Sequence, residues 1–260
     1  MKNTRSLRTA RLELKNLQEN EFYDFSVDHL LLIYSLEAVY SFIPKNACTS
    51  LRFSIAVSNG FLKDKSDLPW IHKNNDTFQP SKREAAIAKY TFVVLRCPFT
   101  RIVSCFFDQV VFNDFFDFTD ASGNKLNLSF HDFLQIVKSQ NRFDRNEHWR
   151  NQSDFLHYEK YDDYFSLEQF PEAISKLDNK GLKFFDTRNE SKHSLLGLKK
   201  VDGNFSKTNE LEIKKMKEGG NIPSYRSMFD EETINLVKEI YSDDIDLYSS
   251  KFGDKDLLFK

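Results

Sequence analysis

Two largely apolar runs dominate the hydrophobic pattern of the chain, over residues 38–43 and 90–95. Both are rich in β-branched and aromatic residues and lack the alternation of a half-exposed strand, so they predict buried strands of a parallel sheet. A Pro-containing turn follows each run, and the apolar spacing of a helix follows each turn, over residues 51–56 and 102–110. This repeated order predicts an α/β fold with a central, mostly parallel sheet flanked by helices.

Three later segments also have helical spacing, over residues 129–139, 166–177 and 230–241. Ser129 stands at the start of the first segment, where a hydroxyl can accept a hydrogen bond from a helix amide, so it predicts an N-cap. Residues 60–83 are polar and interrupted by Gly and Pro, which predicts a long connection with a short helix at most.

The composition bears on nucleic-acid binding and on the number of domains. The chain has 260 residues and a net charge of −2, and its basic residues are spread among acidic ones. This distribution gives no support to nucleic-acid binding, because that function needs a basic stripe or patch. No shift in composition marks a boundary, so we expect a single domain over residues 1–260.

Cysteine content and apolar run length bear on the compartment. Three cysteines cannot form a secreted disulfide scaffold, which favours a reducing environment. The longest apolar stretch, residues 30–34, is too short to span a bilayer, so we expect a cytoplasmic protein without a membrane span. The basic start, with Lys2, Arg5, Arg8 and Arg11, predicts a solvated helix face.

The first turn, Pro44–Ser50, has the makings of an anion site. Lys45 supplies a cation, and Thr49 and Ser50 supply hydroxyls where a helix begins, which is where free N–H groups receive a phosphate. A glycine-built phosphate loop is excluded, because this turn contains no Gly and the whole chain has only 8. An ordinary strand–helix turn with a hydroxyl cap and a solvated Lys is the alternative.

The second turn repeats this design with Arg as the cation. Arg96 ends the strand, and Arg101 and Ser104 share one face of the helix that follows. A guanidinium suits a terminal phosphate, so the two turns together fit a ligand with two separate phosphate-like groups. A structural role is the alternative, with Arg101 paired to a carboxylate such as Asp108.

These turns resemble motifs of the carbohydrate sulfotransferases, in particular the chondroitin and dermatan type. Pro44–Ser50 looks like the 5′-phosphosulfate loop of that family, and Leu95–Ser104 resembles its 3′-phosphate motif. Asn146-Glu147-His148-Trp149, followed by Tyr161-Asp162 and Leu167-Glu168, is similar to a later stretch. Cys97 and Asn151 depart from the family, where an acidic residue and a proline are usual. These departures affect the expected acceptor more than the donor.

The resemblance implies a P-loop-NTPase-like three-layer sandwich that uses 3′-phosphoadenosine 5′-phosphosulfate as donor, with no metal. It implies that Lys45 binds the 5′-phosphosulfate and that Arg96 and Ser104 bind the 3′-phosphate. The rest of the first loop would wrap the phosphosulfate: Pro44, Asn46, Ala47, Cys48, Thr49 and Ser50. The acceptor would be a carbohydrate or another molecule with a hydroxyl group.

A general base must activate that hydroxyl, and His is the favoured type near neutral pH. His72 lies between the two donor motifs, where related enzymes place a catalytic His, and is preferred narrowly over His148. A structural or surface role is the alternative for each. Glu147 could orient His148 or contact the acceptor. The six His residues show no metal-binding spacing with acidic partners.

Aromatic residues over 112–124 and 141–160 are candidates for the acceptor wall, because aromatic faces suit sugar rings. Phe115, Phe116 and Trp149 represent them, and filling of the core is their alternative role. Two other functions stay open at this point. One is a nucleotide or small-molecule kinase that uses ATP and a metal, and the other is a non-catalytic module that senses a nucleotide.

Overall fold

The structure is a computed structural model that describes residues 4–11, 16–74, 76–113, 118–119, 122–123, 126–190 and 195–260. The chain divides into two compact units. The first unit comprises Met1–Arg96 and Gln152–Glu190, and the second comprises Cys97–Asn151 and Ser191–Lys260. A single domain over residues 1–260 stays a prediction.

The first unit contains a four-stranded sheet of order β1-β2-β3-β4. Its strands are β1 (Leu30–Ile33), β2 (Ala38–Ser41), β3 (Tyr90–Leu95) and β4 (Asp163–Ser166). β2, β3 and β4 are parallel, and β1 runs antiparallel to β2. The two apolar runs therefore form adjacent parallel strands, as predicted, although β2 ends two residues before the end of its run.

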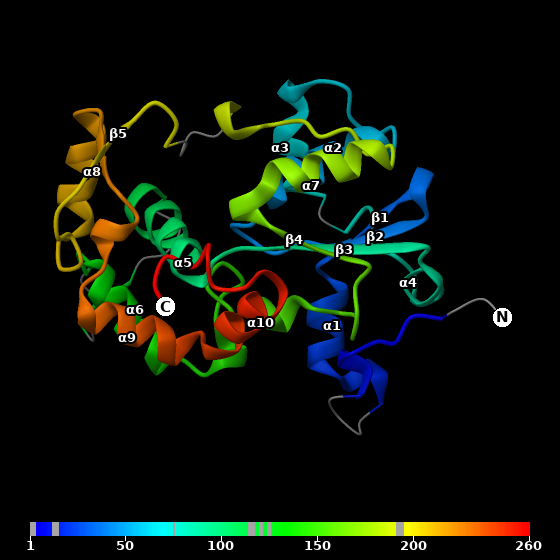
Figure 1. Ribbon diagram of the computed structural model, residues 1–260, viewed down its shortest axis with the longest axis horizontal. Helices are drawn as coiled ribbons and strands as arrows, with labels where there is room; N and C mark the ends of the chain where they lie inside the picture. The colour runs from blue at the N-terminus through cyan, green and yellow to red at the C-terminus, as the bar shows by residue number, and fades with distance from the viewer. Residues whose placement is uncertain are drawn as a thin grey trace. The chain divides into compact units, whose positions relative to one another are not determined.

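Helices cover this sheet. In Figure 1, α2, α3 and α7 lie on one side of the sheet and α1 lies on the other. The helices of the first unit are α1 (Glu21–Val27), α2 (Cys48–Ser58), α3 (Leu68–Ile71), α4 (Lys82–Ile87) and α7 (Phe170–Asn179). Short 3-10 helices accompany them: η1 (Thr9–Arg11), η2 (Leu17–Glu19), η3 (Tyr34–Leu36), η4 (Lys65–Asp67), η7 (Gln152–Phe155), η8 (Leu167–Gln169) and η9 (Arg188–Glu190). The helix predicted over 166–177 begins later, because β4 and η8 occupy its expected start. The predicted sheet flanked by helices is confirmed.

Aromatic side chains fill the core of the first unit. Tyr40 and Phe92 are partners across β2 and β3, both are fully buried, and their rings stack with centroids 4.8 Å apart. Burial of one such side chain contributes about 2–3 kcal/mol, and the ring pair adds about 1 kcal/mol. Phe92, one of the 26 Phe residues of the chain, therefore helps to hold the sheet together.

The basic start of the chain is not a solvated helix face, and this prediction is wrong for Arg5 and Arg8. The backbone N–H of Arg5 donates to the Ala86 carbonyl (2.8 Å), and its guanidinium lies 2.7 Å from the Asp162 carboxylate. The backbone N–H of Arg8 donates to the His157 carbonyl (2.9 Å). Arg5 and Arg8 precede η1, and their backbone N–H groups bond to carbonyls of distant segments. Lys2 lies outside the described residues.

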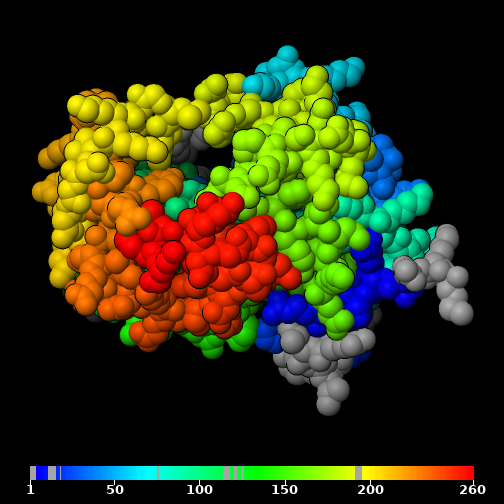
Figure 2. Space-filling view, viewed as in Figure 1, coloured from blue at the N-terminus to red at the C-terminus, as the bar shows by residue number. Residues whose placement is uncertain are grey.

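The second unit is mostly helical. It contains α5 (Pro98–Phe106), the π-helix η5 (Phe107–Phe112), α6 (Phe130–Ser139), η6 (Arg142–Asp144), α8 (Glu210–Glu218), η10 (Arg226–Met228), α9 (Glu231–Ile240) and α10 (Ser242–Phe252). Its two-stranded parallel sheet joins β5 (Lys199–Val201) to β6 (Asn221–Pro223). On the face shown in Figure 2, α10 lies beside α9. Across the described residues of both units, no helix combines the length and the apolar character that a bilayer crossing requires.

Caps fix the predicted helix starts of the second unit. Ser129 Oγ accepts from the Asp132 N–H (3.2 Å), and the Asp132 carboxylate accepts from the Ser129 N–H (3.0 Å), so the two residues form a capping box before α6. Asp230 and Thr233 form the same arrangement at the start of α9. The predicted Ser129 cap and the predicted helices near 129–139 and 230–241 are confirmed.

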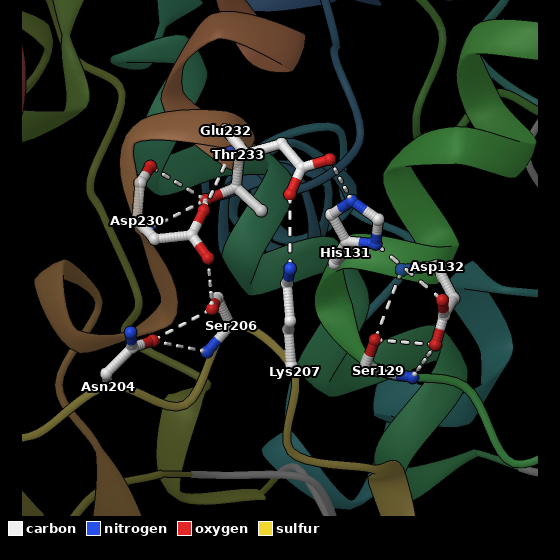
Figure 3. A network of polar contacts seen from close by, with 9 residues as sticks. All are labelled: Ser129, His131, Asp132, Asn204, Ser206, Lys207, Asp230, Glu232 and Thr233. Carbon is white, nitrogen blue, oxygen red and sulfur yellow. Dashed lines mark hydrogen bonds and ion pairs between the residues drawn. The ribbon is translucent and has the colours of Figure 1, made fainter.

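A polar network joins the starts of α6 and α9 (Figure 3). His131 Nε2 lies 2.9 Å from a carboxylate oxygen of Glu232, and Lys207 Nζ lies 3.2 Å from the other oxygen. Ser206 Oγ donates to the Asp230 carboxylate (2.6 Å), and its own carbonyl accepts from the His131 N–H (3.0 Å). These contacts are those of a structural imidazole.

Candidate functional site

The turn between β2 and α2 has an unusual backbone. Lys45 has a φ of 72° and Ala47 a φ of 58°, both in the left-handed region that normally favours glycine. This conformation costs roughly 1–2 kcal/mol at each non-glycine position. Local strain of this kind is typical of ligand-binding turns, where it fixes the direction of backbone N–H groups. The turn thus takes a glycine-like course without any Gly.

The first turn of α2 is open to an anion. Ala47 is its N-cap, no side chain caps it, and it carries no acidic residue. Among the described helices of eight or more residues, only α2 and α5 have neither a side-chain cap nor an acidic residue in the first turn. The N–H groups at the start of a helix have no intrahelical partner and carry partial positive charge. Cys48 and Thr49 lie half-buried in this turn of α2.

Asn46 anchors the turn from its centre. Its side chain is fully buried, and Nδ2 donates to the Val94 carbonyl (2.8 Å) and to Gln152 Oε1 (2.7 Å). Its Oδ1 is buried and accepts no hydrogen bond from any described residue. Both amide hydrogens are therefore directed into the protein. A contact of Asn46 with the phosphosulfate stays a prediction.

The Ser50 hydroxyl is also directed into the protein. It lies 2.8 Å from Thr187 Oγ1 and accepts from the Thr187 N–H (3.1 Å). Its side chain is 4% exposed, and the preceding Pro44 is buried as well. Ser50 thus holds the 187 segment against α2. A contact of Ser50 with the phosphosulfate stays a prediction.

Arg96 follows β3 and approaches the first turn. Its Nη1 donates to the Lys45 carbonyl with a distance of 2.8 Å. Its backbone N–H donates to Gln152 Oε1 (3.0 Å), and Gln152 Nε2 donates to the Arg96 carbonyl (2.9 Å). The structure therefore brings the guanidinium of Arg96 to the backbone of Lys45 in the first unit. Sequence reasoning missed Gln152, because no local motif marks a residue 56 positions from its partner.

The second unit holds Arg101 and Ser104, the other residues predicted to bind the sulfuryl donor. Arg101 in α5 is 2% exposed, and its guanidinium donates to the carbonyls of Arg150 (2.7 Å) and Glu147 (3.4 Å). These contacts with backbone carbonyls are structural, and a pairing of Arg101 with the Asp108 carboxylate stays a prediction. Ser104 lies half-buried on the same helix. Phosphate contacts of Arg101 and Ser104 stay predictions.

The second unit also fixes the orientation of His148. The Nδ1 atom of His148 lies 2.8 Å from Asn146 Oδ1, and the Glu147 carboxylate lies 3.9 Å from the same nitrogen. An amide oxygen only accepts hydrogen bonds, so Nδ1 carries the proton in the neutral ring. The lone pair is then on Nε2, as a general base requires. In the first unit, His72 is exposed directly after α3.

Of the aromatic acceptor candidates Phe115, Phe116 and Trp149, the structure describes Trp149. Trp149 is 3% exposed, its ring packs edge-on against Phe133, and its Nε1 donates to Gln140 Oε1 (2.9 Å). These contacts favour the core-filling alternative for Trp149. Phe115 and Phe116 lie outside the described residues.

Comparison with known proteins identifies a family. The model of the sulfotransferase family matches residues 29–249, a range that includes both turns and His72 and His148. The family is P-loop-like in fold, in agreement with the parallel strands β2, β3 and β4. Comparisons with curated proteins and with solved structures find no match. Within the described ranges, no group of three or more His, Cys, Asp and Glu residues could hold a metal ion.

Proposed function

Because the chain belongs to the sulfotransferase family, we propose that it transfers the sulfuryl group of 3′-phosphoadenosine 5′-phosphosulfate to a hydroxyl of a carbohydrate-like acceptor. One observation carries the choice of donor. The strained, uncapped turn before α2 places Lys45 beside Arg96, at the ends of two adjacent parallel strands. Ligands of open α/β sheets bind at this edge.

The residues of the turn fit the charge of the donor. The 5′-phosphosulfate is an anion, and the N–H groups that begin α2 suit it because the first turn of α2 carries no acidic residue. Lys45 adds an ammonium, and Arg96 adds a guanidinium suited to a phosphate. These features support a donor with separated anionic groups.

Lys45 has the central chemical role in this proposal. Transfer of the sulfuryl group leaves adenosine 3′,5′-bisphosphate, and negative charge develops on the oxygen that is released. A preorganised ammonium stabilises that charge, and the partial positive charge at the start of α2 adds to it. Sulfuryl transfer shares with phosphoryl transfer the need for in-line geometry and an activated hydroxyl.

The base that activates the acceptor is one of two imidazoles. The position of the ring proton is better defined in His148, because Asn146 Oδ1 accepts from Nδ1–H and the lone pair is then on Nε2. His72 is exposed and belongs to the same unit as Lys45. Glu147 retains its proposed role beside His148 or at the acceptor. The chondroitin or dermatan type of acceptor stays a prediction, as do acceptor contacts of Phe115, Phe116 and Trp149.

The three cysteines are all free thiols, which supports a reducing compartment and the proposed cytoplasmic location.

The proposed function is tested with a sulfur-labelled donor on an array of hydroxyl-bearing sugars. We expect label on at least one sugar and none when Lys45 is replaced by Ala. Phosphate transfer from ATP–Mg²⁺ in place of sulfuryl transfer would support the kinase alternative. Donor binding without transfer to any acceptor would support the sensing module.

A further inference from the structure

The Gln152 side chain joins the two strand-end turns of the first unit. It is 1% exposed and lies at the start of η7. Its Oε1 accepts from the Arg96 N–H (3.0 Å) and from Asn46 Nδ2 (2.7 Å), and its Nε2 donates to the Arg96 carbonyl (2.9 Å). One amide therefore contacts the residue after β3 and the centre of the turn after β2.

The contacts with Arg96 continue the hydrogen-bond pattern of the sheet by one residue. β4 pairs with β3 as far as Leu95 and Ser166, so Arg96 is the first residue beyond this ladder. The Gln152 amide supplies both the acceptor and the donor that a neighbouring strand would give to Arg96. This pairing holds the backbone of Arg96 in place where its side chain turns toward Lys45.

The contact with Asn46 acts on the strained turn. Asn46 lies between Lys45 and Ala47, the two residues with positive φ. Its Nδ2 is held by Gln152 Oε1 on one side and by the Val94 carbonyl on the other. A strained turn persists only when its surroundings over-determine it. Gln152 belongs to a distant segment of the chain, and its bond to Asn46 is one of the contacts that hold the turn in this conformation.

We propose that Gln152 is a positioning residue that sets Lys45 and Arg96 at the spacing required by the donor's two anionic groups. This inference rests on the proposed function for the identity of the donor. Gln152 acts through Asn46 and the Arg96 backbone. Glutamine is required because the contacts need one acceptor and one donor in the same planar group, which Glu and Ala do not offer.

The test measures binding of adenosine 3′,5′-bisphosphate by calorimetry in the full-length chain. We expect Gln152→Ala to raise the dissociation constant by about tenfold or more, because the hydrogen bonds that fix two charged contacts are lost. Gln152→Glu retains the acceptor atoms but lacks the N–H and adds negative charge, so we expect at least the same loss. Gln79→Ala is the matched control, because Gln79 is exposed in the same unit and bonds to Asp28.

Two further readouts separate positioning from general loss of structure. In a double-mutant cycle, the effects of Asn46→Ala and Gln152→Ala should be clearly non-additive, since both remove the same bond. Hydrogen exchange should become faster in peptides that cover 44–48 and 95–97, and should stay unchanged in peptides from β1 and α1. Uniformly faster exchange, or additive effects, would overturn the positioning role.

The outcomes also distinguish this inference from the proposed function. If the wild type binds the bisphosphate and both Gln152 variants bind it equally well, the positioning role is wrong and the proposed donor stands. If the wild type does not bind it, the proposed donor is wrong. The exchange experiment then decides whether Gln152 orders the two turns, and equal exchange in wild type and variant would overturn that role as well. If Gln152→Ala does not fold, Gln152→Glu carries the test.

Discussion

The guanidinium of Arg96 donates a hydrogen bond to the carbonyl oxygen of Lys45, with Nη1 and the oxygen 2.8 Å apart. The two residues are 51 positions apart in the chain and follow adjacent parallel strands. One cation thus helps to hold the backbone that carries the other. Loss of the Arg96 side chain should therefore affect both a ligand contact and the position of Lys45.

Replacement of Lys45 should abolish sulfuryl transfer and leave the fold intact. Lys45 is half-buried, and its φ of 72° suits glycine better than alanine. Lys45→Gly therefore removes the ammonium without adding backbone strain, and Lys45→Ala removes it with strain retained. We expect a fall in turnover of about a hundredfold or more in both, as in the loss of a preorganised charge-stabilising group. Turnover of labelled donor measures it.

Lys63→Ala is the control for Lys45, because Lys63 is an exposed lysine of the same unit. It should retain the full turnover. Full turnover in Lys45→Gly would remove Lys45 from the chemistry. Activity in Lys45→Gly together with inactivity in Lys45→Ala would assign the effect to the backbone of the turn.

Replacement of Arg96 should weaken binding of the donor product. We expect Arg96→Ala to raise the dissociation constant for adenosine 3′,5′-bisphosphate by about tenfold or more, the effect of losing a charged hydrogen bond. Arg96→Lys should recover only part of this loss, because an ammonium lacks the planar fork of the guanidinium. Arg83→Ala, at an exposed position of α4, should bind as the wild type does. An unchanged constant in Arg96→Ala would exclude Arg96 from the site.

The pH–rate profile should identify the general base. A base loses activity below its pKa, so the profile of the wild type should fall on the acidic side. The variant that lacks the base should have a much lower rate and no acidic limb. His148→Ala should behave in this way if the proton arrangement set by Asn146 is the functional one. If the acidic limb persists in His148→Ala and disappears in His72→Ala, His72 is the base.

Acid should destabilise the first unit through His157. This side chain is fully buried, its Nδ1 lies 2.8 Å from Ser26 Oγ, and burial lowers the pKa of His157 to about 4 from a usual 6.5. Between these two values the unfolded chain binds a proton that the folded chain does not. The free energy of unfolding should therefore fall as the pH drops from about 6.5 toward 4, by roughly 3 kcal/mol in full.

Urea denaturation at pH 7 and pH 5 measures this effect. His157→Asn should be less stable than the wild type at pH 7, and the difference between the two proteins should shrink at pH 5. Carboxylates titrate in both proteins and cancel in the comparison. A difference that stays constant between the two pH values would show that His157 does not carry the acid sensitivity.

Local sequence patterns were sufficient for part of the fold. Largely apolar runs identified β2 and β3, and the capping residue Ser129 identified the start of α6, because burial and capping are decided by a few neighbouring residues. β1 lies within the apolar stretch 30–34, but that stretch alone does not show that it pairs antiparallel with the strand that follows. β4 begins with the polar Asp163 and does not stand out by its pattern. Its place in the sheet depends on pairing with a distant strand, β3, which a single sequence does not display.

The candidate site was also predictable only in part from the sequence. Lys45 and Arg96 were predicted because parallel strands bring their carboxyl ends to one edge. The roles of Asn46, Ser50 and Trp149 depend on which atoms their side chains meet, and the residues they meet lie elsewhere in the chain. Gln152 shows the same limit most clearly, since it bonds to Arg96 and Asn46, which are 56 and 106 positions away.

Calorimetric titration of the wild type with adenosine 3′,5′-bisphosphate tests the central claim most directly, because it needs no knowledge of the acceptor. We predict binding without magnesium, and binding about tenfold or more tighter than that of adenosine 5′-monophosphate, since the 3′-phosphate adds charged hydrogen bonds. ATP–Mg²⁺ should bind more weakly than the bisphosphate. No binding of the bisphosphate, or tighter binding of ATP–Mg²⁺, would contradict the assignment of the turn at Lys45 and Arg96 to a sulfuryl donor.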